Sequence, residues 1–368
     1  MRVLHLYRPR LPSLRAQSVQ VLHACHALAR RGHRVTLLAD RGAPDASARS
    51  ALDGFGLPSL EDVDCRGGSL DLRIAPGRHP GLAGAWFRAQ VLAWWAGPRG
   101  VVLARDKRRL AGFLGLPSRH KVVIETHELD SALLREQGCE GAPMVRLETR
   151  VLAGADGLVA NCGGTLDAWR EAHGDALPEL QLACHNATSA SRHRDPHPDP
   201  DPVVRCLGSA RSFKGAGFYL GAAPSLPLPL EWIGASDQEQ ARFDSPESGV
   251  RLLPAVPYRR VPDVLARSQV LLLPLEDNLF GRSLTSPLKL WDYLATCAPI
   301  VAPDLPSVRE IAAMIAVPLH LHAPGDVAGL ADAVTRAMAA PTRAPHLRTW
   351  DRRAAELEAV LQQAGAGP

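Results

Sequence analysis

The first forty residues, MRVLHLYRPRLPSLRAQSVQVLHACHALARRGHRVTLLAD, decide the fold class. A short apolar run at Val3–Leu6 has the length of a buried strand, and apolar residues recur at helical spacing over Ser18–Arg31. Gly32 is placed to end that helix in a left-handed cap, and Val35–Ala39 is a second apolar run. This order predicts a strand–helix–strand unit.

The same alternation continues along the chain. Further strand-like runs in the first half are Val101–Ala104, Val122–Thr126 and Leu158–Asn161. Those in the second half are Val203–Leu207, Leu230–Ile233, Val250–Leu253, Val270–Pro274, Ile300–Ala302 and Val317–Leu321. Continuous apolar strands separated by helices are typical of parallel sheets that are covered on both faces, so we expect an α/β protein.

A change of composition separates the two halves. Residues 187–202 read ATSASRHRDPHPDPDP, with four prolines and no large apolar side chain, which predicts an exposed linker. At roughly 150 residues per domain, 368 residues favour two domains. We expect doubly wound domains over residues 1–186 and 203–345, and a terminal helix within 346–368. In such domains ligands bind at the carboxyl ends of the strands, so the expected site is the cleft between them.

Composition excludes several classes of protein. The chain is 46% hydrophobic and 22% charged, which is typical of a soluble globular protein, and no apolar run approaches the ~20 residues that span a bilayer. Seven scattered cysteines without a CxxC motif fit neither a disulfide framework nor a zinc site. The first residues become polar too quickly for a signal peptide. We therefore expect a cytoplasmic protein, with peripheral attachment to the inner face of the membrane left open.

The net charge of +4 comes from the first half of the chain. Residues 1–180 hold 24 basic and 19 acidic residues, whereas the remainder holds 18 and 19. This excess fits an anionic acceptor or a membrane surface, and it is far too weak for a nucleic-acid-binding protein. The aromatic stretch Trp86–Trp95 fits core packing better than an interfacial helix. Only four basic residues are lysines: Lys107, Lys121, Lys214 and Lys289.

The segment TSPLKLWDYLATCAPIVA (285–302) carries the most chemistry. Ser286 can cap a helix, and the amides of Thr285 and Ser286 would then meet an anion at the helix N-terminus. Lys289 lies one turn into this helix, where its ammonium can meet a phosphate, and Asp292 on the same face can accept from ribose hydroxyls. Together these groups predict a nucleoside-diphosphate site. The alternative is a capped helix with a solvated Lys289–Asp292 pair worth ~0.3 kcal/mol.

A second segment, CLGSARSFKGAG (206–217), lies between a predicted strand and a predicted helix. Gly208, Gly215 and Gly217 allow the backbone to approach a ligand closely, and Lys214 supplies a second cation. The segment matches neither a Walker loop nor GxGxxG, so an ordinary glycine-bearing turn is the alternative. Two of the four lysines nevertheless fall at two predicted phosphate-binding turns.

At this point the chain resembles glycosyltransferase family 4, the retaining "glycosyl transferases group 1" type, which has the GT-B fold of two Rossmann-like domains facing each other. The segment SPLKLWDYLATCAPIVAPDLPSVRE (286–310) resembles the donor-binding signature of that family. Other segments follow in the family's order: RAQSVQVLHACHALARRGHRVTLLA, VVIETHELD, VANCGGTLDAW, LACHNATS, LGSARSFKG and VRLLPAVPYRRVPDVLARSQVLLLP. The resemblance covers nearly the whole chain and is most specific in the first of these segments.

The resemblance implies a retaining transfer of a sugar from a nucleoside-diphosphate-sugar to a hydroxyl of a glycan or glycolipid precursor, without a metal or other cofactor. It implies that Lys214 and Lys289 act on the departing diphosphate and that His127 approaches the donor sugar. The other implied donor-binding residues are Gly208, Ser209, Arg211, Val256, Thr285, Ser286 and Asp292. The acceptor-side candidates are Ser13, Arg15, Arg105, Glu125 and His127.

The chain departs from the family pattern at several positions. Ser209 stands where the family often has an arginine, and Leu284 and Asp292 stand at the positions of its paired acids. The loop after the first strand, RPRLPS (8–13), replaces a glycine-rich loop. With Arg15, Arg105 and the run KRR (107–109), this loop can form a cationic acceptor face.

Two other functions stay open at this point. The first is a nucleotide-sugar epimerase of similar fold, which needs acid and base groups that Glu125, His127 and Glu128 would supply. The second is a catalytically degenerate relative that binds nucleotide-sugars without turnover, for which the altered acids at Leu284 and Asp292 argue.

Overall fold

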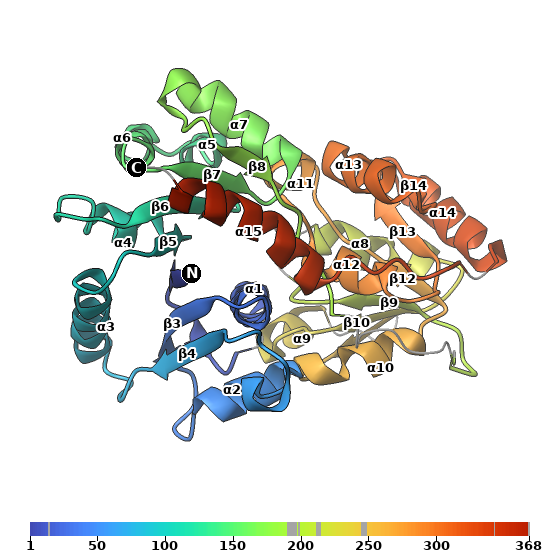
Figure 1. Cartoon of the computed structure of the whole chain (residues 1–368). Helices are drawn as coiled ribbons and strands as arrows, with labels where there is room; N and C mark the ends of the chain where they lie inside the picture. Colours follow the sequence, from blue (N-terminus) through green and yellow to red (C-terminus); the bar gives the residue numbers. More distant parts are fainter. Residues whose placement is uncertain are drawn as a thin grey trace. The chain divides into compact units, whose positions relative to one another are not determined.

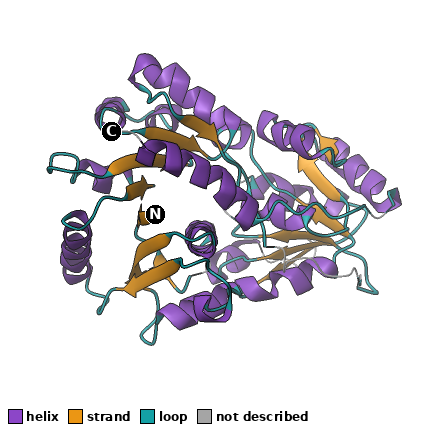
Figure 2. Cartoon of the chain, in the orientation of Figure 1, coloured by secondary structure: helices purple, strands orange, loops and turns teal. Residues whose placement is uncertain are grey.

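The computed structural model describes residues 1–13, 15–189, 197, 199–210, 215–243, 249–341 and 343–366. The chain divides into two compact units, the first made of Met1–His185 with Trp350–Pro368 and the second of Asn186–Thr349. Both units are layered from helices and a parallel sheet, as Figure 2 shows. The predicted site residues Arg211 and Lys214, and most of the predicted linker, lie outside the described residues.

The sheet of the first unit is parallel throughout its described pairings. Its strand order is β2-β3-β1-β5-β6-β7-β8, with β4 also paired to β3. The strands are β1 (Arg2–Leu6), β2 (Arg10–Leu11), β3 (Arg34–Arg41), β4 (Ser69–Ile74), β5 (Val101–Ala104), β6 (Lys121–Thr126), β7 (Gly157–Ala160) and β8 (Gln181–Ala183). The order reverses around β1 and β5, where the carboxyl ends of doubly wound strands form binding sites.

Helices connect these strands and cover the sheet (Figure 1). They are α1 (Ala16–Arg30), α2 (Ala48–Phe55), α3 (Pro80–Trp95), α4 (Lys107–Ala111), α5 (Asp130–Glu136), α6 (Ala142–Leu152), α7 (Gly163–His173) and α15 (Trp350–Ala366), with short 3-10 turns at Leu60–Asp62 and Gly174–Ala176. Gly32 follows α1 with φ +95°, which confirms the predicted left-handed position. On α3, Phe87, Trp94 and Trp95 are buried, which confirms the prediction of core packing for these residues, whereas Trp86 is half-buried and Leu92 is exposed.

The last helix, α15, belongs to the first unit although the second unit precedes it in the chain. Its inner face buries Leu357 and Leu361 completely. Its polar residues reach α1 and the turn after it, since Asp351 pairs with Arg30 at 3.2 Å and Glu358 accepts from His33 at 2.8 Å. The helix is therefore an integral part of the first unit.

The second unit contains a six-stranded parallel sheet in the order β11-β10-β9-β12-β13-β14. The strands are β9 (Val204–Leu207), β10 (Leu230–Ile233), β11 (Val250–Leu253), β12 (Val270–Leu272), β13 (Ile300–Pro303) and β14 (His320–His322). The helices are α8 (Ala216–Ala222), α9 (Asp237–Phe243), α10 (Val261–Ala266), α11 (Leu279–Ser283), α12 (Leu288–Leu294), α13 (Pro306–Ile315) and α14 (Val327–Ala339), with 3-10 turns at Ala223–Ser225 and Tyr258–Arg260.

Both faces of this second sheet are buried. Leu207 and Leu271 belong to one apolar cluster, whereas their neighbours Cys206 and Leu272 belong to the cluster on the opposite face. Alternate residues of a strand point to opposite faces, so a strand buried on both sides has to be apolar throughout. This confirms the predicted fold class.

Four details of the prediction are wrong or incomplete. The last strand begins at His320 rather than Val317, because Pro318 has no N–H to donate to a strand pairing. Three strands were not predicted. β2 is only two residues long. β4 is a partly exposed edge strand in which apolar and polar residues alternate, and β8 is only three residues long.

Candidate functional site

The two predicted phosphate-binding turns meet at the carboxyl end of β9. Lys289 lies in the first turn of α12, and a Cβ built on Gly208 would lie 3.4 Å from its Nζ atom. This Nζ atom is buried, and no hydrogen-bond partner for it exists among the described residues. Burial lowers the pKa of Lys289. A buried ammonium without a partner is costly, so the arrangement is typical of a group that receives an anion.

The backbone around Gly208 is fixed by its neighbours. Its N–H donates to Ile233 O at 2.7 Å, and its carbonyl accepts from Trp232 Nε1 at 2.6 Å. Gly208 has φ +111° and Gly234 has φ +117°. A Cβ on Gly234 would lie 2.9 Å from the carbonyl carbon of Gly208. The turn after β9, at Gly208, and the turn after β10, at Gly234, therefore pack backbone against backbone, which only glycine permits.

Helix α12 is held rigidly against the sheet by Tyr293. The N–H of Leu207 donates to the Tyr293 hydroxyl at 2.9 Å, and this hydroxyl lies 3.3 Å from Leu272 O, to which it donates. The tyrosine thus bridges β9 and β12 from a fully buried position, and burial raises its pKa well above the usual value. Helix α12, which contains Lys289, is therefore anchored to the sheet.

The predicted helix cap at Ser286 is wrong. Helix α12 begins at Leu288 with Pro287 at the N-cap position and no side-chain capping bond. The Ser286 hydroxyl instead accepts from the N–H of Asn186 and from Trp291 Nε1, both at 3.0 Å. The buried indole needs an acceptor, and Ser286 supplies it. Thr285 and Ser286 are 5% and 3% exposed, so they line the base of this region rather than its surface.

Asp292, the predicted ribose ligand, accepts hydrogen bonds from two protein hydroxyls. Thr188 Oγ1 donates to its Oδ1 at 2.7 Å, and the Tyr258 hydroxyl lies 3.3 Å from both carboxylate oxygens. Tyr258 belongs to the segment predicted to meet the base, in which Val256 packs half-buried against the core. The structure thus brings Asp292 to the predicted base region. Sequence reasoning missed both hydroxyls, because Thr188 lay in the expected linker.

In the first unit, Glu125 lies at the carboxyl end of β6 and is 1% exposed. Four side chains donate to it: Gln20 at 2.7 Å, Arg353 at 2.6 Å, and His5 and His127 at 3.2 Å each. Burial alone would raise its pKa, but the Arg353 guanidinium and the two histidines hold the pKa well below its usual range. This burial and saturation argue that Glu125 orients its neighbours and does not contact an acceptor.

His127 is the partly accessible member of this network. Its side chain is 12% exposed, and burial together with the nearby Arg105 guanidinium lowers its pKa to about 4, despite its hydrogen bond to Glu125. The ring is therefore neutral at pH 7. Because its Nε2 faces the Glu125 carboxylate, Nε2 carries the proton and Nδ1 carries the lone pair. The sequence predicted His127 but not Arg353, which is 228 residues away from Glu125.

The predicted cationic face is wrong for Lys107 and Arg109 of the run after β5, whereas Arg108 is exposed as predicted. The ammonium of Lys107 is buried and pairs with Asp130 at 2.7 Å and Glu148 at 3.7 Å, and Arg109 pairs with the nearby Asp106 at 2.7 Å. The carboxylates that neutralise Lys107 are distant in the sequence, so the local pattern does not show them. Arg105 donates to Gln20, so it contributes to the network around Glu125.

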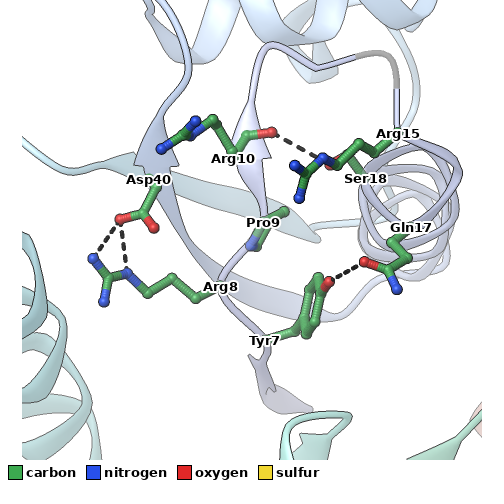
Figure 3. Close-up of a pocket in the computed structure, with 8 residues that line it drawn as sticks. All are labelled: Tyr7, Arg8, Pro9, Arg10, Arg15, Gln17, Ser18 and Asp40. Atoms are coloured by element: carbon green, nitrogen blue, oxygen red, sulfur yellow. Dashed lines mark hydrogen bonds and ion pairs between the residues drawn. The ribbon is translucent and has the colours of Figure 1, made fainter. Parts of the chain in front are cut away.

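A polar pocket of about 230 Å³ lies beside the loop that follows β1 (Figure 3). Its lining comes from the end of β1, from β2 and β3 and from the first turn of α1: Tyr7, Arg8, Pro9, Arg10, Arg15, Gln17, Ser18 and Asp40. Arg15 is the predicted acceptor-side residue that lines it. Ser13, another candidate, accepts from the N–H of Arg15 at 3.1 Å and so shapes the loop.

Within the described residues, no helix is long and apolar enough to cross a lipid bilayer. No group of three or more His, Cys, Asp or Glu side chains in that same part of the chain is arranged to hold a metal ion.

Models of known protein families match both units of the chain. A family model described as "Glycosyl transferase 4-like domain" matches residues 15–183, and one described as "Glycosyl transferases group 1" matches residues 201–340. No curated protein sequence matches the chain.

Solved structures of similar fold span the whole chain. Sucrose-phosphate synthase from Thermosynechococcus elongatus is 15% identical with a TM-score of 0.67, and the match covers 99% of this chain and 96% of that one. WaaG, a glycosyltransferase involved in lipopolysaccharide biosynthesis, is 14% identical with a TM-score of 0.64 over 99% and 98%. AviGT4, a glycosyltransferase involved in avilamycin A biosynthesis, is 17% identical with a TM-score of 0.60 over 100% and 98%.

Proposed function

Because the chain belongs to the glycosyltransferases of the group 1 type, with the GT-B fold, we propose that it transfers a sugar from a nucleoside-diphosphate-sugar to a hydroxyl of a glycan or glycolipid precursor, with retention of configuration. One observation carries this proposal. It is the buried Lys289 ammonium that has no partner among the described residues and lies beside the glycine turn after β9. A diphosphate is the anion that such a turn and cation would hold.

In this proposal the second unit binds the donor. Lys289 neutralises the departing diphosphate, and Lys214, from the sequence segment 206–217, adds a second positive charge. Asp292 binds the ribose hydroxyls, which take the place of the Thr188 and Tyr258 hydroxyls at its oxygens. The backbone near Val256 meets the base.

The reaction needs no side-chain nucleophile. The bond between the anomeric carbon and the diphosphate oxygen breaks while the acceptor oxygen attaches on the same face of the sugar. The proton of the acceptor hydroxyl passes to the departing phosphate oxygen. Positive charge at Lys289 and Lys214 stabilises the charge that develops on the leaving group, and electrostatic stabilisation of this kind is commonly the largest contribution to catalysis. His127, neutral at pH 7, would accept a hydrogen bond at Nδ1 from a donor hydroxyl.

The epimerase alternative needs a free acid and base. Of its three candidates, Glu125 is saturated by four donors and His127 has a pKa of about 4, so neither is suited to exchange a proton at neutral pH. Burial raises the pKa of the third candidate, Glu128, but one such group does not supply both the acid and the base. This argues for transfer over epimerisation. A nucleotide-sugar-binding relative without turnover remains an outcome of the experiment below.

The test is a thermal-shift screen with the diphosphates of uridine, guanosine, adenosine, thymidine and cytidine. At about 100 times its Kd, the true ligand adds about 2.7 kcal/mol to the free energy of unfolding, which raises Tm by several degrees. Lys289→Met should abolish the response. Lys121→Met is the matched control, because Lys121 pairs with Asp156 at 3.3 Å at the amino end of β6. An unchanged response of Lys289→Met would contradict the assignment of the site.

Turnover is tested next with the sugar conjugate of the responding diphosphate. Release of the diphosphate that depends on an added acceptor supports transfer. Conversion of the sugar without an acceptor would identify an epimerase, and binding without either reaction would identify a degenerate relative.

A further inference from the structure

The pocket beside the loop after β1 has an unbalanced charge (Figure 3). Its lining contains three arginines and one carboxylate. The carboxylate belongs to Asp40 and forms an ion pair with Arg8, whose Nε lies 2.7 Å and whose Nη2 lies 2.6 Å from Asp40 Oδ1. The side chains of Arg10 and Arg15 are exposed, and the first turn of α1 contains no acidic residue to offset them. Two positive charges therefore remain at the pocket.

The frame that carries these two arginines is well fixed. The backbone of Arg10 on β2 lies opposite that of Asp40 on β3 in the sheet. The carbonyl of Arg10 also accepts a hydrogen bond from Ser18 Oγ at 3.3 Å. On the other side, the Tyr7 hydroxyl donates to Gln17 Oε1 at 2.8 Å. In Figure 3 the Arg10 side chain extends from β2 toward the side of Asp40, whereas the Arg15 side chain lies on the side of α1, next to Ser18. Other polar groups around the pocket are thus paired with one another, while the exposed Arg10 and Arg15 side chains line the pocket from different elements.

The size of the pocket limits its ligand. Its volume of about 230 Å³ exceeds that of a few water molecules, at ~30 Å³ each. It is smaller than the roughly 300–1,000 Å³ of a site that encloses a whole drug-sized ligand. The space therefore suits one charged group of a larger molecule. Guanidinium groups bind phosphate and carboxylate oxygens in matching bidentate geometry.

We propose that this pocket binds an anionic group of the acceptor, a phosphate ester or a carboxylate, through Arg10 and Arg15. The inference rests on the proposed function, because it assigns the pocket to the substrate that receives the sugar. The donor diphosphate has its own cations in the second unit. The acceptor of this enzyme is therefore an acidic molecule.

The test measures binding of inorganic phosphate and of acetate by isothermal titration calorimetry at low ionic strength. The chain carries Lys289→Met in every sample, so that the proposed diphosphate site does not contribute. We expect saturable binding of phosphate, weakened at least tenfold by Arg10→Gln combined with Arg15→Gln. Arg49→Gln, an exposed arginine on α2, is the control and should leave binding unchanged.

Each outcome decides the proposal. Binding of phosphate alone supports a phosphorylated acceptor, and binding of both anions supports a general anion pocket. Absence of binding, or equal binding by the double variant, overturns the proposal. The two arginines are exposed, so the double variant should keep its Tm. The nucleotide thermal shift of the chain with native Lys289 tests the proposed function separately, and the Arg10/Arg15 double variant should leave it unchanged.

Discussion

Replacing Lys289 by methionine should stabilise the ligand-free protein. Methionine has nearly the length of lysine, so the space beside Gly208 stays filled while the buried charge is removed. An ionised group buried without a hydrogen-bond partner costs several kcal/mol before the surroundings relax. After relaxation we expect the free energy of unfolding to rise by about 1–3 kcal/mol. The same change should remove the response to nucleoside diphosphates.

Differential scanning calorimetry is the direct measurement. For a unit of this size, each kcal/mol raises Tm by about 2–4 °C. The pH dependence provides a second check, because burial lowers the pKa of Lys289 in the folded state from 10.5. Between the two pKa values the unfolded chain binds more protons, so wild-type stability should rise with pH in that window. The methionine variant should lack this rise.

A lower Tm of the Lys289→Met variant would contradict this prediction. It would show that the ammonium makes a favourable interaction in the ligand-free protein. Lys289 would then not mark a site for a diphosphate. Lys121→Met is again the control, and we expect it to leave Tm unchanged or slightly lower, because it loses a partly exposed ion pair.

Three further predictions concern other contacts. Arg353→Met leaves the buried Glu125 carboxylate without its ion pair and should lower the free energy of unfolding by about 3–5 kcal/mol in urea titrations; no loss would mean that the pair is not formed. Folding lowers the pKa of Glu125, so the stability that its carboxylate contributes is present above pH 4.5 and should fall as the pH drops through the folded pKa. Glu125→Gln should remove this acid sensitivity when unfolding is measured as a function of pH. Gly208→Ala places a Cβ at φ +111° and 3.4 Å from the Lys289 Nζ atom, so it should cost about 1 kcal/mol or more of stability and weaken diphosphate binding in calorimetry. An unchanged Kd would contradict the close approach of the diphosphate to the backbone of Gly208.

The sequence predicted those parts of the fold in which one local pattern dominates. Runs such as Leu230–Ile233 are apolar throughout because both faces of the sheet are covered, and this leaves a clear signal. The edge strand β4 was missed because its apolar residues alternate with polar ones, so it lacks the continuous apolar run by which most other strands were predicted. Helix α12 was predicted, but its start was not, because the hydrogen bond from the buried Trp291 indole to Ser286 depends on tertiary packing.

The same limit applies to the candidate site. Lys289 and Gly208 were predicted from their own segments, and the structure adds that they meet. The buried partners of Lys107 and the donors around Glu125 come from distant parts of the chain. A single sequence contains no signal for such pairs, so charges that form internal networks were predicted as a cationic surface.

The return of the chain to its first unit has a consequence for biosynthesis. The second unit is inserted between His185 and Trp350, and the segments by which the chain enters and leaves it are joined where the N–H of Thr188 donates to Arg348 O at 2.8 Å. A ribosome therefore completes the second unit before α15 is made. Until Arg353 emerges, Glu125 lacks its guanidinium partner and the first unit lacks the apolar face of its last helix. The part of the protein that is synthesised first is thus the last that can finish folding.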